Sequence, residues 1–329
     1  MILSIFDLLL GLVLILGGAN FLTDGSSAIA RRWGVSDLVI GLTVVAFGTS
    51  APEFVISVLA ALNGSAGLAV GNVVGSNIFN ILVIIGVTAL ISPIKVKGSI
   101  LTNDLPLVVL SALVLLAMGN SPLLDGAPEA IVTRVDGIIL LLFFTIFMRY
   151  TFNQARRSET APQKDSAAAS EASTPHLPMP MWKAVVWVVG GLAALIYGGD
   201  RFVAGASAIA SSLGVSDAII GLTVVAAGTS LPELATSVVA ALKGKTGLAI
   251  GNVIGSNIFN IFLILGTAAT IRPLPFGKIG NLDLLVLTGA SLLFWLFAGV
   301  YKRRTITRLE GGILAAAYIA YIVTLIVNL

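Results

Sequence analysis

The sequence predicts an all-α, polytopic membrane protein with ten transmembrane helices arranged as two inverted five-helix repeats. Three observations predict this class. Of the 329 residues, 57% are hydrophobic and only 11% are charged, whereas a soluble domain carries about 25% charged residues. The apolar residues form ten runs, each close to the length of about 20 residues that crosses a bilayer as a helix. The second half of the chain also repeats the first half at an offset of 180 residues.

The composition excludes several classes of protein. Sixteen acidic and 19 basic residues are too few to cover the surface of a water-soluble protein of this size, and the high hydrophobicity excludes a disordered chain. The chain has no Cys, which excludes disulfides, thiolate metal sites and a thiol nucleophile. It also lacks the basic face of a nucleic-acid-binding protein. Membrane lipid is therefore an expected partner, and the sequence indicates no obligate protein partner.

The ten expected helices follow one another with short connections, except at one long polar segment. They cover roughly 3–30, 37–62, 67–92, 102–119, 131–150, 182–210, 217–242, 247–271, 282–300 and 309–328. Transmembrane strands would alternate in polarity, and these runs do not. The organisation is thus residues 1–150 as the first five-helix repeat, residues 151–181 as a flexible linker rich in Ser, Ala and Pro, and residues 182–329 as the second, inverted repeat.

The distribution of basic residues predicts the orientation. If the N-terminus lies outside, 15 of the 19 Lys and Arg residues face the cytoplasm and four face outward. Cytoplasmic loops of membrane proteins carry such an excess of basic residues. We therefore expect both termini outside and the linker 151–181 in the cytoplasm.

The repeat is strongest in two polar stretches of the expected helices. Residues 41–81 and 221–261 are identical at 30 of 41 positions without a gap. Because each copy contains five spans, an odd number, the second copy enters the membrane upside down. Inverted repeats of this kind are typical of secondary transporters, whose substrate sites lie near the middle of the membrane between the repeats.

The first repeated motif, Gly-Thr-Ser-x-Pro-Glu, ends at Glu53 and again at Glu233. Its Pro is expected to break the helix and free backbone carbonyl oxygens, which membrane proteins tolerate only where protein or a watery cavity satisfies them. A charged side chain at the centre of a bilayer costs at least about 2.5–3.5 kcal/mol. Two facing carboxylates would also repel each other unless a cation lay between them.

The second motif, Gly-Asn-Val-x-Gly-Ser-Asn-Ile-Phe-Asn, occurs at residues 71–80 and 251–260. Ser76 and Asn80 are four residues apart and share one helix face, as do Ser256 and Asn260. Carboxylate, amide, hydroxyl and carbonyl oxygens together favour Ca²⁺, Na⁺ or Mg²⁺, and flexible broken helices suit Ca²⁺ better than Mg²⁺. Two carboxylates neutralise one Ca²⁺ or two Na⁺, so a third Na⁺ would make an exchange electrogenic.

These paired motifs resemble the two α-repeats of the sodium/calcium exchanger family, which belongs to the cation/Ca²⁺ antiporters. The short linker is similar to that of prokaryotic members, which implies a location in a prokaryotic inner (plasma) membrane. The resemblance implies no resident cofactor, with Ca²⁺ and Na⁺ as the transported ions. The matching Ca²⁺ ligands are Glu53 and Glu233 with the carbonyls of Thr49 and Thr229. The matching Na⁺ ligands are Ser50, Ser76 and the carbonyl of Ala46, with Ser230, Ser256 and the carbonyl of Ala226 in the other repeat. Asn80 and Asn260 match the family's pair at the middle of the membrane, where some relatives carry an Asp.

The family resemblance implies an antiporter that exchanges three Na⁺ for one Ca²⁺ by alternating access, with the first and sixth spans sliding against the other helices. Three alternatives remain open. One is an antiporter coupled to H⁺ or K⁺ on the same scaffold, and another is a channel or receptor. The third, an intramembrane enzyme, is disfavoured because the paired acids are Glu residues that follow Pro and lack a motif that positions water. We therefore expect no enzymatic activity.

Overall fold

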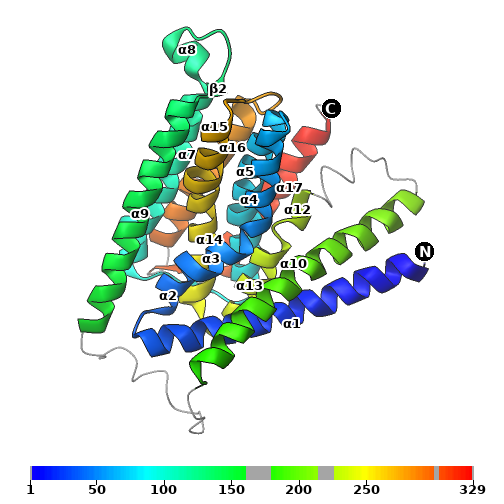
Figure 1. The fold of residues 1–329 in the computed structure, drawn as a ribbon, viewed down its shortest axis with the longest axis vertical. Coiled ribbons are helices and arrows are strands. Elements are labelled where there is room, and N and C mark those ends of the chain that lie inside the picture. The colour runs from blue at the N-terminus through cyan, green and yellow to red at the C-terminus, as the bar shows by residue number, and fades with distance from the viewer. Residues whose placement is uncertain (1, 161–178, 214–225, 300–303, 328–329) are drawn as a thin grey trace.

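The computed structural model describes residues 2–160, 179–213, 226–299 and 304–327, which form an elongated bundle of helices (Figure 1). Within these ranges, eight helices are long and apolar enough to cross a membrane, and the count is nine if one bent pair is a single span. The expected all-helical, polytopic membrane fold is therefore confirmed. The first part of the expected span 217–242 lies outside the described residues, and its second part forms an apolar helix, Leu231–Leu242.

The helices of the first half follow the order of the expected spans. They are α1 (Ile2–Trp33), α2 (Asp37–Ile40), η1 (Gly41–Val45), α3 (Ala46–Thr49), α4 (Ala51–Leu62), α5 (Ala66–Phe79), η2 (Asn80–Ile85), α6 (Gly86–Ile91), η3 (Ile100–Asp104), α7 (Leu105–Gly119), α8 (Ser121–Asp125) and α9 (Arg134–Thr160). The segments labelled η are π-helices, which are continuous with their α-helical neighbours.

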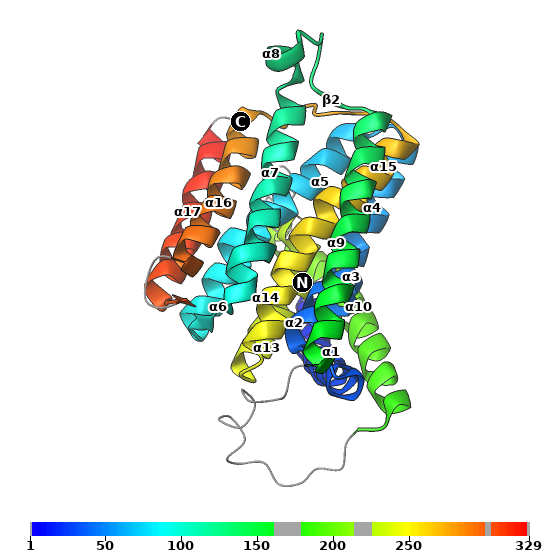
Figure 2. The same cartoon turned by 90° about the vertical axis from the view of Figure 1, so that its left-hand side faces the viewer.

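The described helices of the second half repeat this order. They are α10 (Met181–Ser212), α12 (Ala226–Gly228), α13 (Leu231–Leu242), α14 (Thr246–Ile258), η5 (Phe259–Leu265), α15 (Gly266–Ile271), α16 (Asn281–Gly299) and α17 (Arg308–Val327). The spans that carry the second motif lie at the centre of the bundle, because 94% of an apolar 18-residue window in span 246–271 and 72% of one in span 66–91 are buried. In Figure 2, α14 lies between α7 and α9, and its continuation α15 passes behind α9.

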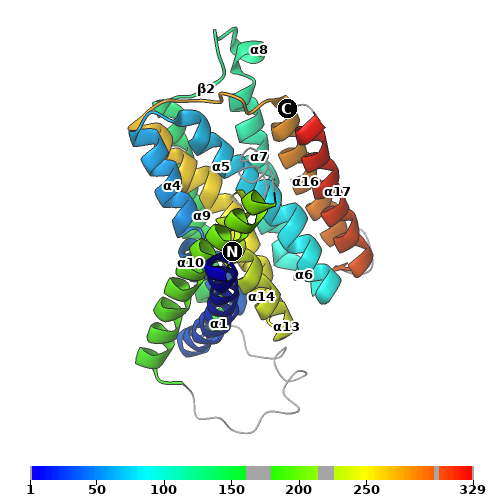
Figure 3. The ribbon, with the colours of Figure 1, turned by 90° about the vertical axis from the view of Figure 1, so that its right-hand side faces the viewer.

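The two longest helices, α1 and α10, run side by side along one flank of the bundle (Figures 1 and 3). Their glycines recur at seven-residue intervals and face each other across the contact. A Cβ atom added to Gly18 would lie 2.7 Å from the carbonyl oxygen of Gly191, and one added to Gly11 would lie 2.6 Å from that of Gly198. Only glycine permits this approach of two backbones, which is a common packing device in membranes.

Four two-residue strands join the two halves of the chain outside the helices. Strand β1 (Ile94–Lys95) pairs antiparallel with β4 (Thr305–Ile306), and β2 (Ile131–Val132) pairs antiparallel with β3 (Leu274–Pro275). Both ribbons are absent from the sequence-based expectation, because a two-residue strand is too short to show an alternating pattern.

The end of α9 differs from the expected organisation. The helix continues to Thr160, ten residues into the expected linker 151–181. The residues beyond the membrane-length run, such as Gln154, Ala155 and Arg156, are good helix formers. The sequence then reaches Pro162, before which a helical backbone is disfavoured. Residues 161–178, the rest of the expected linker except its end, lie outside the described residues.

Candidate ion-binding site

Each of the two Gly-Thr-Ser-x-Pro-Glu motifs breaks its helix at the Ser, as the prolines predict. Helix α3 ends at Thr49 and α4 begins at Ala51, with a bend of 48° between the two helix axes. The backbone of Ser50 leaves the helical region at φ −83°, ψ 7°, and that of Ser230 does so at φ −91°, ψ 6°. Each Pro then sits in the first turn of the following helix, where its missing N–H breaks no hydrogen bond.

The breaks place Glu53 and Glu233 in the first turns of α4 and α13. A helix N-terminus favours a negative charge, because its free N–H groups and its dipole point toward it. Both glutamates are nevertheless only 1% exposed. Two acids are thus held in the interior of the bundle at positions with a partial positive potential.

Crossed hydrogen bonds bring the two glutamates into one site. The hydroxyl of Ser50 donates to Oε1 of Glu233 at 2.9 Å, and the hydroxyl of Ser230 donates to Oε1 of Glu53 at 3.3 Å. The carboxyl groups are near enough to interact electrostatically. Each repeat therefore supplies a carboxylate to the site and a hydroxyl to the carboxylate of the other repeat.

The threonines that precede these serines lie beside the same carboxyl groups. Thr229 lies beside the carboxyl group of Glu53, and Thr49 lies beside that of Glu233. Thr49 is fully buried, and its hydroxyl donates to the carbonyl oxygen of Val45 at 3.1 Å. Both threonines predicted from the sequence therefore lie at the site.

A second pair of equivalent residues supports the backbone of the glutamates. The side-chain amide of Asn72 donates to the carbonyl oxygen of Glu53 at 3.2 Å and to the hydroxyl of Ser57 at 2.9 Å. Asn252 makes the equivalent bonds to Glu233, at 3.3 Å, and to Ser237, at 3.1 Å. In both repeats the asparagine N–H groups thus satisfy a carbonyl oxygen near the helix break.

The serines in these contacts, Ser57 and Ser237, are site-supporting residues that the sequence analysis missed. Each is buried and lies four residues after its glutamate, one helical turn away. That spacing was a usable signal, because residues four apart on a helix share a face.

The asparagines that end the second motif lie where the central helices change form. Asn80 begins η2, and Asn260 lies in η5. The amide of Asn260 donates to Oδ1 of Asn77 at 2.9 Å, and the amide of Asn77 donates to the carbonyl oxygen of Asn257 at 3.2 Å. This polar contact joins the central helices of the two repeats. Single-turn π-helices often occur at functional sites.

Several buried oxygen atoms of the two glutamates and of the second motif have no hydrogen-bond partner within the described ranges. They are Oε2 of Glu53, Oε2 of Glu233, Oγ of Ser256, Oδ1 of Asn80 and Oδ1 of Asn260. A buried polar atom without a partner is unfavourable. All five atoms are hard oxygen donors, the kind that bind Na⁺ and Ca²⁺. In the described part of the chain, no group of three or more His, Cys, Asp or Glu residues is placed to hold a metal ion. A cation would therefore rely on two carboxylates and neutral oxygens.

The remaining predicted ligands lie close in sequence to this cluster. Ser76 is buried in α5. The carbonyl oxygen of Ala46 accepts the N–H of Ser50 at 3.0 Å, while in the second repeat the N–H of Ser230 bonds to Ala227. Ala226 is the first described residue of α12. The two repeats therefore differ in local hydrogen bonding just before the helix break.

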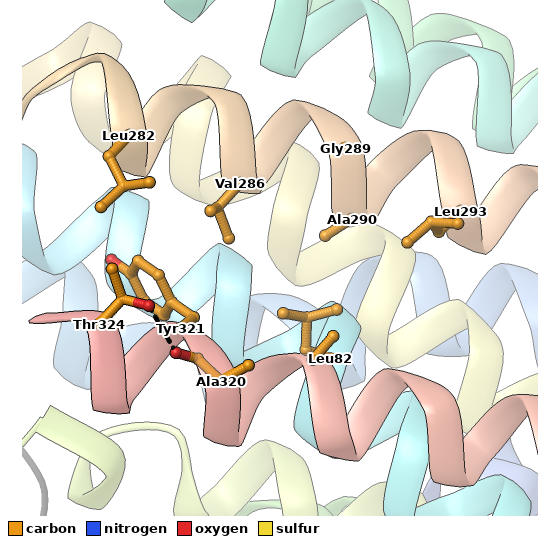
Figure 4. Close-up of a pocket in the computed structure, with 10 residues that line it drawn as sticks. Leu82, Leu282, Val286, Gly289, Ala290, Leu293, Ala320, Tyr321 and Thr324 are labelled. Atoms are coloured by element: carbon orange, nitrogen blue, oxygen red, sulfur yellow. Dashed lines mark hydrogen bonds between the residues drawn. The ribbon is translucent and has the colours of Figure 1, made fainter.

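Two cavities among the described residues are lined by neither glutamate. The larger, about 360 Å³, lies between α16 and α17 and is lined mainly by apolar side chains such as Leu282, Val286 and Leu293 (Figure 4). The smaller, about 80 Å³, lies beside Ser50 and is lined by aromatic residues including Phe54 and Phe259. The larger cavity lacks the polar lining of an ion site.

Comparison with known proteins identifies the family. The model of the family described as "sodium/calcium exchanger protein" matches residues 3–153 and 183–327. The chain belongs to the sodium/calcium exchanger family. The resemblance drawn from the paired motifs is thus confirmed.

Individual relatives of this exchanger-family chain match it over nearly its whole length. It is 40% identical to a protein from Alkalimonas amylolytica named putative antiporter CaxA, with 98% of both chains covered. It is 34% identical to the sodium/calcium exchanger MaX1 from Methanosarcina acetivorans, with 97% of both covered. A solved structure of the sodium-calcium exchanger NCX_Mj, soaked with Na⁺ and Ca²⁺, matches with a TM-score of 0.82, 34% identity and 99% coverage of both chains.

Proposed function

We propose that this chain exchanges Na⁺ for Ca²⁺ across a membrane by alternating access, with three Na⁺ moving against one Ca²⁺. The observation that carries the proposal is the crossed pair of hydrogen bonds from Ser50 to Glu233 and from Ser230 to Glu53. This arrangement joins two buried carboxylates from opposite repeats in one site. Two negative charges balance one Ca²⁺ or two Na⁺, so a third Na⁺ makes each cycle move one net charge.

The same site is proposed for both ions, which therefore compete for it. Glu53 and Glu233 hold Ca²⁺ together with the backbone carbonyls of Thr49 and Thr229. The proposed Na⁺ ligands are Ser50, Ser76, Ser230, Ser256 and the carbonyls of Ala46 and Ala226. Asn80 and Asn260 lie at the middle of the membrane between the two repeats. The unpartnered oxygens of Glu53, Glu233, Ser256, Asn80 and Asn260 support this assignment.

The proposed topology has ten spans in two inverted repeats, with both termini outside and the linker in the cytoplasm of a prokaryotic cell. The two antiparallel strand pairs support a membrane crossing by segment 217–242, the seventh expected span, which brings the number of spans to ten. Strand β1 follows the third span and β4 follows the ninth, whereas β2 follows the fourth and β3 follows the eighth. If segment 217–242 did not cross the membrane, the partners in each ribbon would lie on opposite sides of the bilayer and their pairing would be impossible.

Flux measurements in proteoliposomes test the exchange. We expect ⁴⁵Ca²⁺ uptake into Na⁺-loaded vesicles, accelerated by an inside-positive potential because three Na⁺ leave for each Ca²⁺ that enters. Glu53→Gln should abolish the uptake, while Glu129→Gln, which changes an exposed acid, serves as the matched control. Uptake driven by a pH gradient at fixed Na⁺, or one that requires K⁺, would replace the Na⁺ proposal with an H⁺- or K⁺-coupled antiporter. Flux without coupling between ions would indicate a channel.

A further inference from the structure

A pair of lysines holds one acidic residue of α1 at the end of the helix that we assign to the cytoplasm. Lys243 Nζ lies 2.8 Å from Oδ2 of Asp24, and Lys245 Nζ lies 3.0 Å from Oδ1 of the same residue. Both lysines also reach backbone carbonyls of α1, at Asn20 (3.5 Å) and Thr23 (3.4 Å). We call Asp24, Lys243 and Lys245 the α1 latch. It connects α1 to the turn between α13 and α14.

The internal repeat shows that the fold does not require these charges. At the offset of 180 residues, Asp24 corresponds to Ala204, and Lys243 and Lys245 correspond to Asn63 and Ser65. The turn itself is kept, because its central glycine has a positive φ in both copies, 78° at Gly64 and 71° at Gly244. The latch is therefore an addition to one end of a duplicated scaffold.

Holding α1 also holds α10. The two helices pack backbone to backbone along their length, since a Cβ on Gly25 would lie 2.8 Å from the carbonyl oxygen of Ala184 and one on Gly205 would lie 2.6 Å from that of Ser4. Separating them would lose this packing, so we expect them to move together. The ion pair between Asp7 and Arg201, at 3.7 Å, joins the same two helices near their other end. The latch therefore fixes a two-helix unit rather than a single helix.

The latch also lies at the end of the helix face that carries Glu233. On α13, Glu233, Thr236, Ala240 and Lys243 follow one helix face from the site to the latch. Within the described residues, the hydroxyl of Thr236 has no hydrogen-bond partner although it is fully buried. This face, closed in the structure, is the candidate for a passage from the site to the latch.

The part of α1 beside Asp24 also carries buried hydroxyls. The side chains of Thr23, Ser26 and Ser27 are at most 1% exposed, and in the described ranges none of their hydroxyls has a partner. Buried hydroxyls without partners are unfavourable in a permanent helix contact. They are suitable for a surface that water and ions reach when α1 moves away from α13.

We propose that the α1 latch closes the Lys243 end of the ion path, and that its ion pairs favour the state in which this end is closed. The proposal rests on the alternating-access function proposed above. Because the equivalent positions of the other repeat are uncharged, the latch favours one of the two facing states over the other. Ion pairs that are partly exposed change such an equilibrium by about threefold to tenfold.

The absence of native Cys allows a direct test with one reporter. Ser27→Cys places a thiol in the closed passage, where a membrane-impermeant maleimide reacts slowly from the Lys243 side of oriented vesicles. Asp24→Asn should raise the labelling rate about fivefold, by the shift in population estimated from the lost ion pairs. Asp7→Asn is the matched control, because it breaks an ion pair between α1 and α10 that stays within the moving unit.

Two further measurements keep the test independent of folding and of the transported ion. Charge reversal with Asp24→Lys, Lys243→Asp and Lys245→Asp should return labelling toward the original rate. High salt should accelerate labelling in the unmodified latch and have no effect in Asp24→Asn, since salt screens partly exposed charges. Equal labelling in Asp24→Asn and Asp7→Asn would overturn the latch. Labelling that behaves as expected in a chain that carries no Ca²⁺ would keep the latch and refute the proposed function.

Discussion

Asn72 and Asn252 occupy equivalent positions in two nearly identical motifs, yet the structure predicts that their removal has unequal effects. Both donate to a glutamate carbonyl and to a serine hydroxyl. Only Asn252 also accepts a hydrogen bond, from the hydroxyl of Thr49 at 3.1 Å, among the described residues. Asn252 is fully buried, whereas Asn72 is half-buried.

The expected magnitudes follow from the number of bonds. Side-chain hydrogen bonds between membrane helices contribute about 0.6 kcal/mol on average. Asn252→Ala removes three bonds and should lower the free energy of unfolding by about 2 kcal/mol, while Asn72→Ala removes two and should lower it by about 1 kcal/mol. The Thr49 hydroxyl has a single proton, which it shares between Asn252 and the carbonyl oxygen of Val45, each at 3.1 Å. In Asn252→Ala it can donate wholly to Val45, so the loss of this acceptor leaves no unpaired hydroxyl and does not enlarge the difference greatly.

Thermal unfolding of the purified protein in detergent measures this difference. The four tryptophans provide an intrinsic fluorescence signal. A difference of about 1 kcal/mol corresponds to roughly 2 °C in the unfolding midpoint of a protein of this size. Thr49→Val should have a smaller effect in the Asn252→Ala background than in the Asn72→Ala background, because the bond it removes is already absent. A midpoint for Asn72→Ala at or below that of Asn252→Ala would refute the reasoning.

Three other changes test the site and the helix pair. Glu53→Gln should reduce Ca²⁺ uptake at least about a hundredfold, which exceeds the loss typical of groups that only support a ligand. Measurements of ⁴⁵Ca²⁺ flux test this, with size-exclusion chromatography as a check that the variant folds. Ser50→Ala should raise the KM for Ca²⁺ by about tenfold, and Ser230→Ala by less, because its bond to the opposite carboxylate is 3.3 Å rather than 2.9 Å; a larger effect of Ser230→Ala would contradict the geometry. Gly18→Ala forces a Cβ against a backbone oxygen 2.7 Å away and should cost about 1–3 kcal/mol. Gly17→Ala, with open space around the added atom, should not lower the unfolding midpoint and should raise it slightly, because Ala favours a helix interior over Gly.

The meeting of the two glutamates was predictable because it follows from the repeat and not from detailed packing. A Pro in the middle of a span breaks the helix. The break places the following Glu in the first turn of a new helix. Two copies with opposite orientation then bring their central segments together. The sequence therefore predicted the positions of Glu53 and Glu233 without any knowledge of individual contacts.

Other parts of the site depend on choices that the sequence does not reveal. The asparagine side chains contain both donors and acceptors, and the structure alone shows that Asn72 and Asn252 use their donors. The π-helices at Asn80 and Asn260 follow the same apolar pattern as ordinary helices, since one extra residue per turn leaves little trace in a uniformly buried span. The two short ribbons depend on how loops from different repeats meet.

The unequal contacts of Asn72 and Asn252 also bear on the mechanism. The residues that make these contacts, Thr49, Asn72, Thr229 and Asn252, are the same in both repeats, so we infer that the inequality reports the conformation of the two halves. In the part of the chain that the structure describes, Thr49 bonds to Asn252, but Thr229 forms no such bond to Asn72. Under alternating access the two repeats exchange their conformations when the site changes sides. The bond between Thr49 and Asn252 should then break as one forms between Thr229 and Asn72. The difference in stability between the two asparagine variants should therefore reverse in protein held in the opposite facing state.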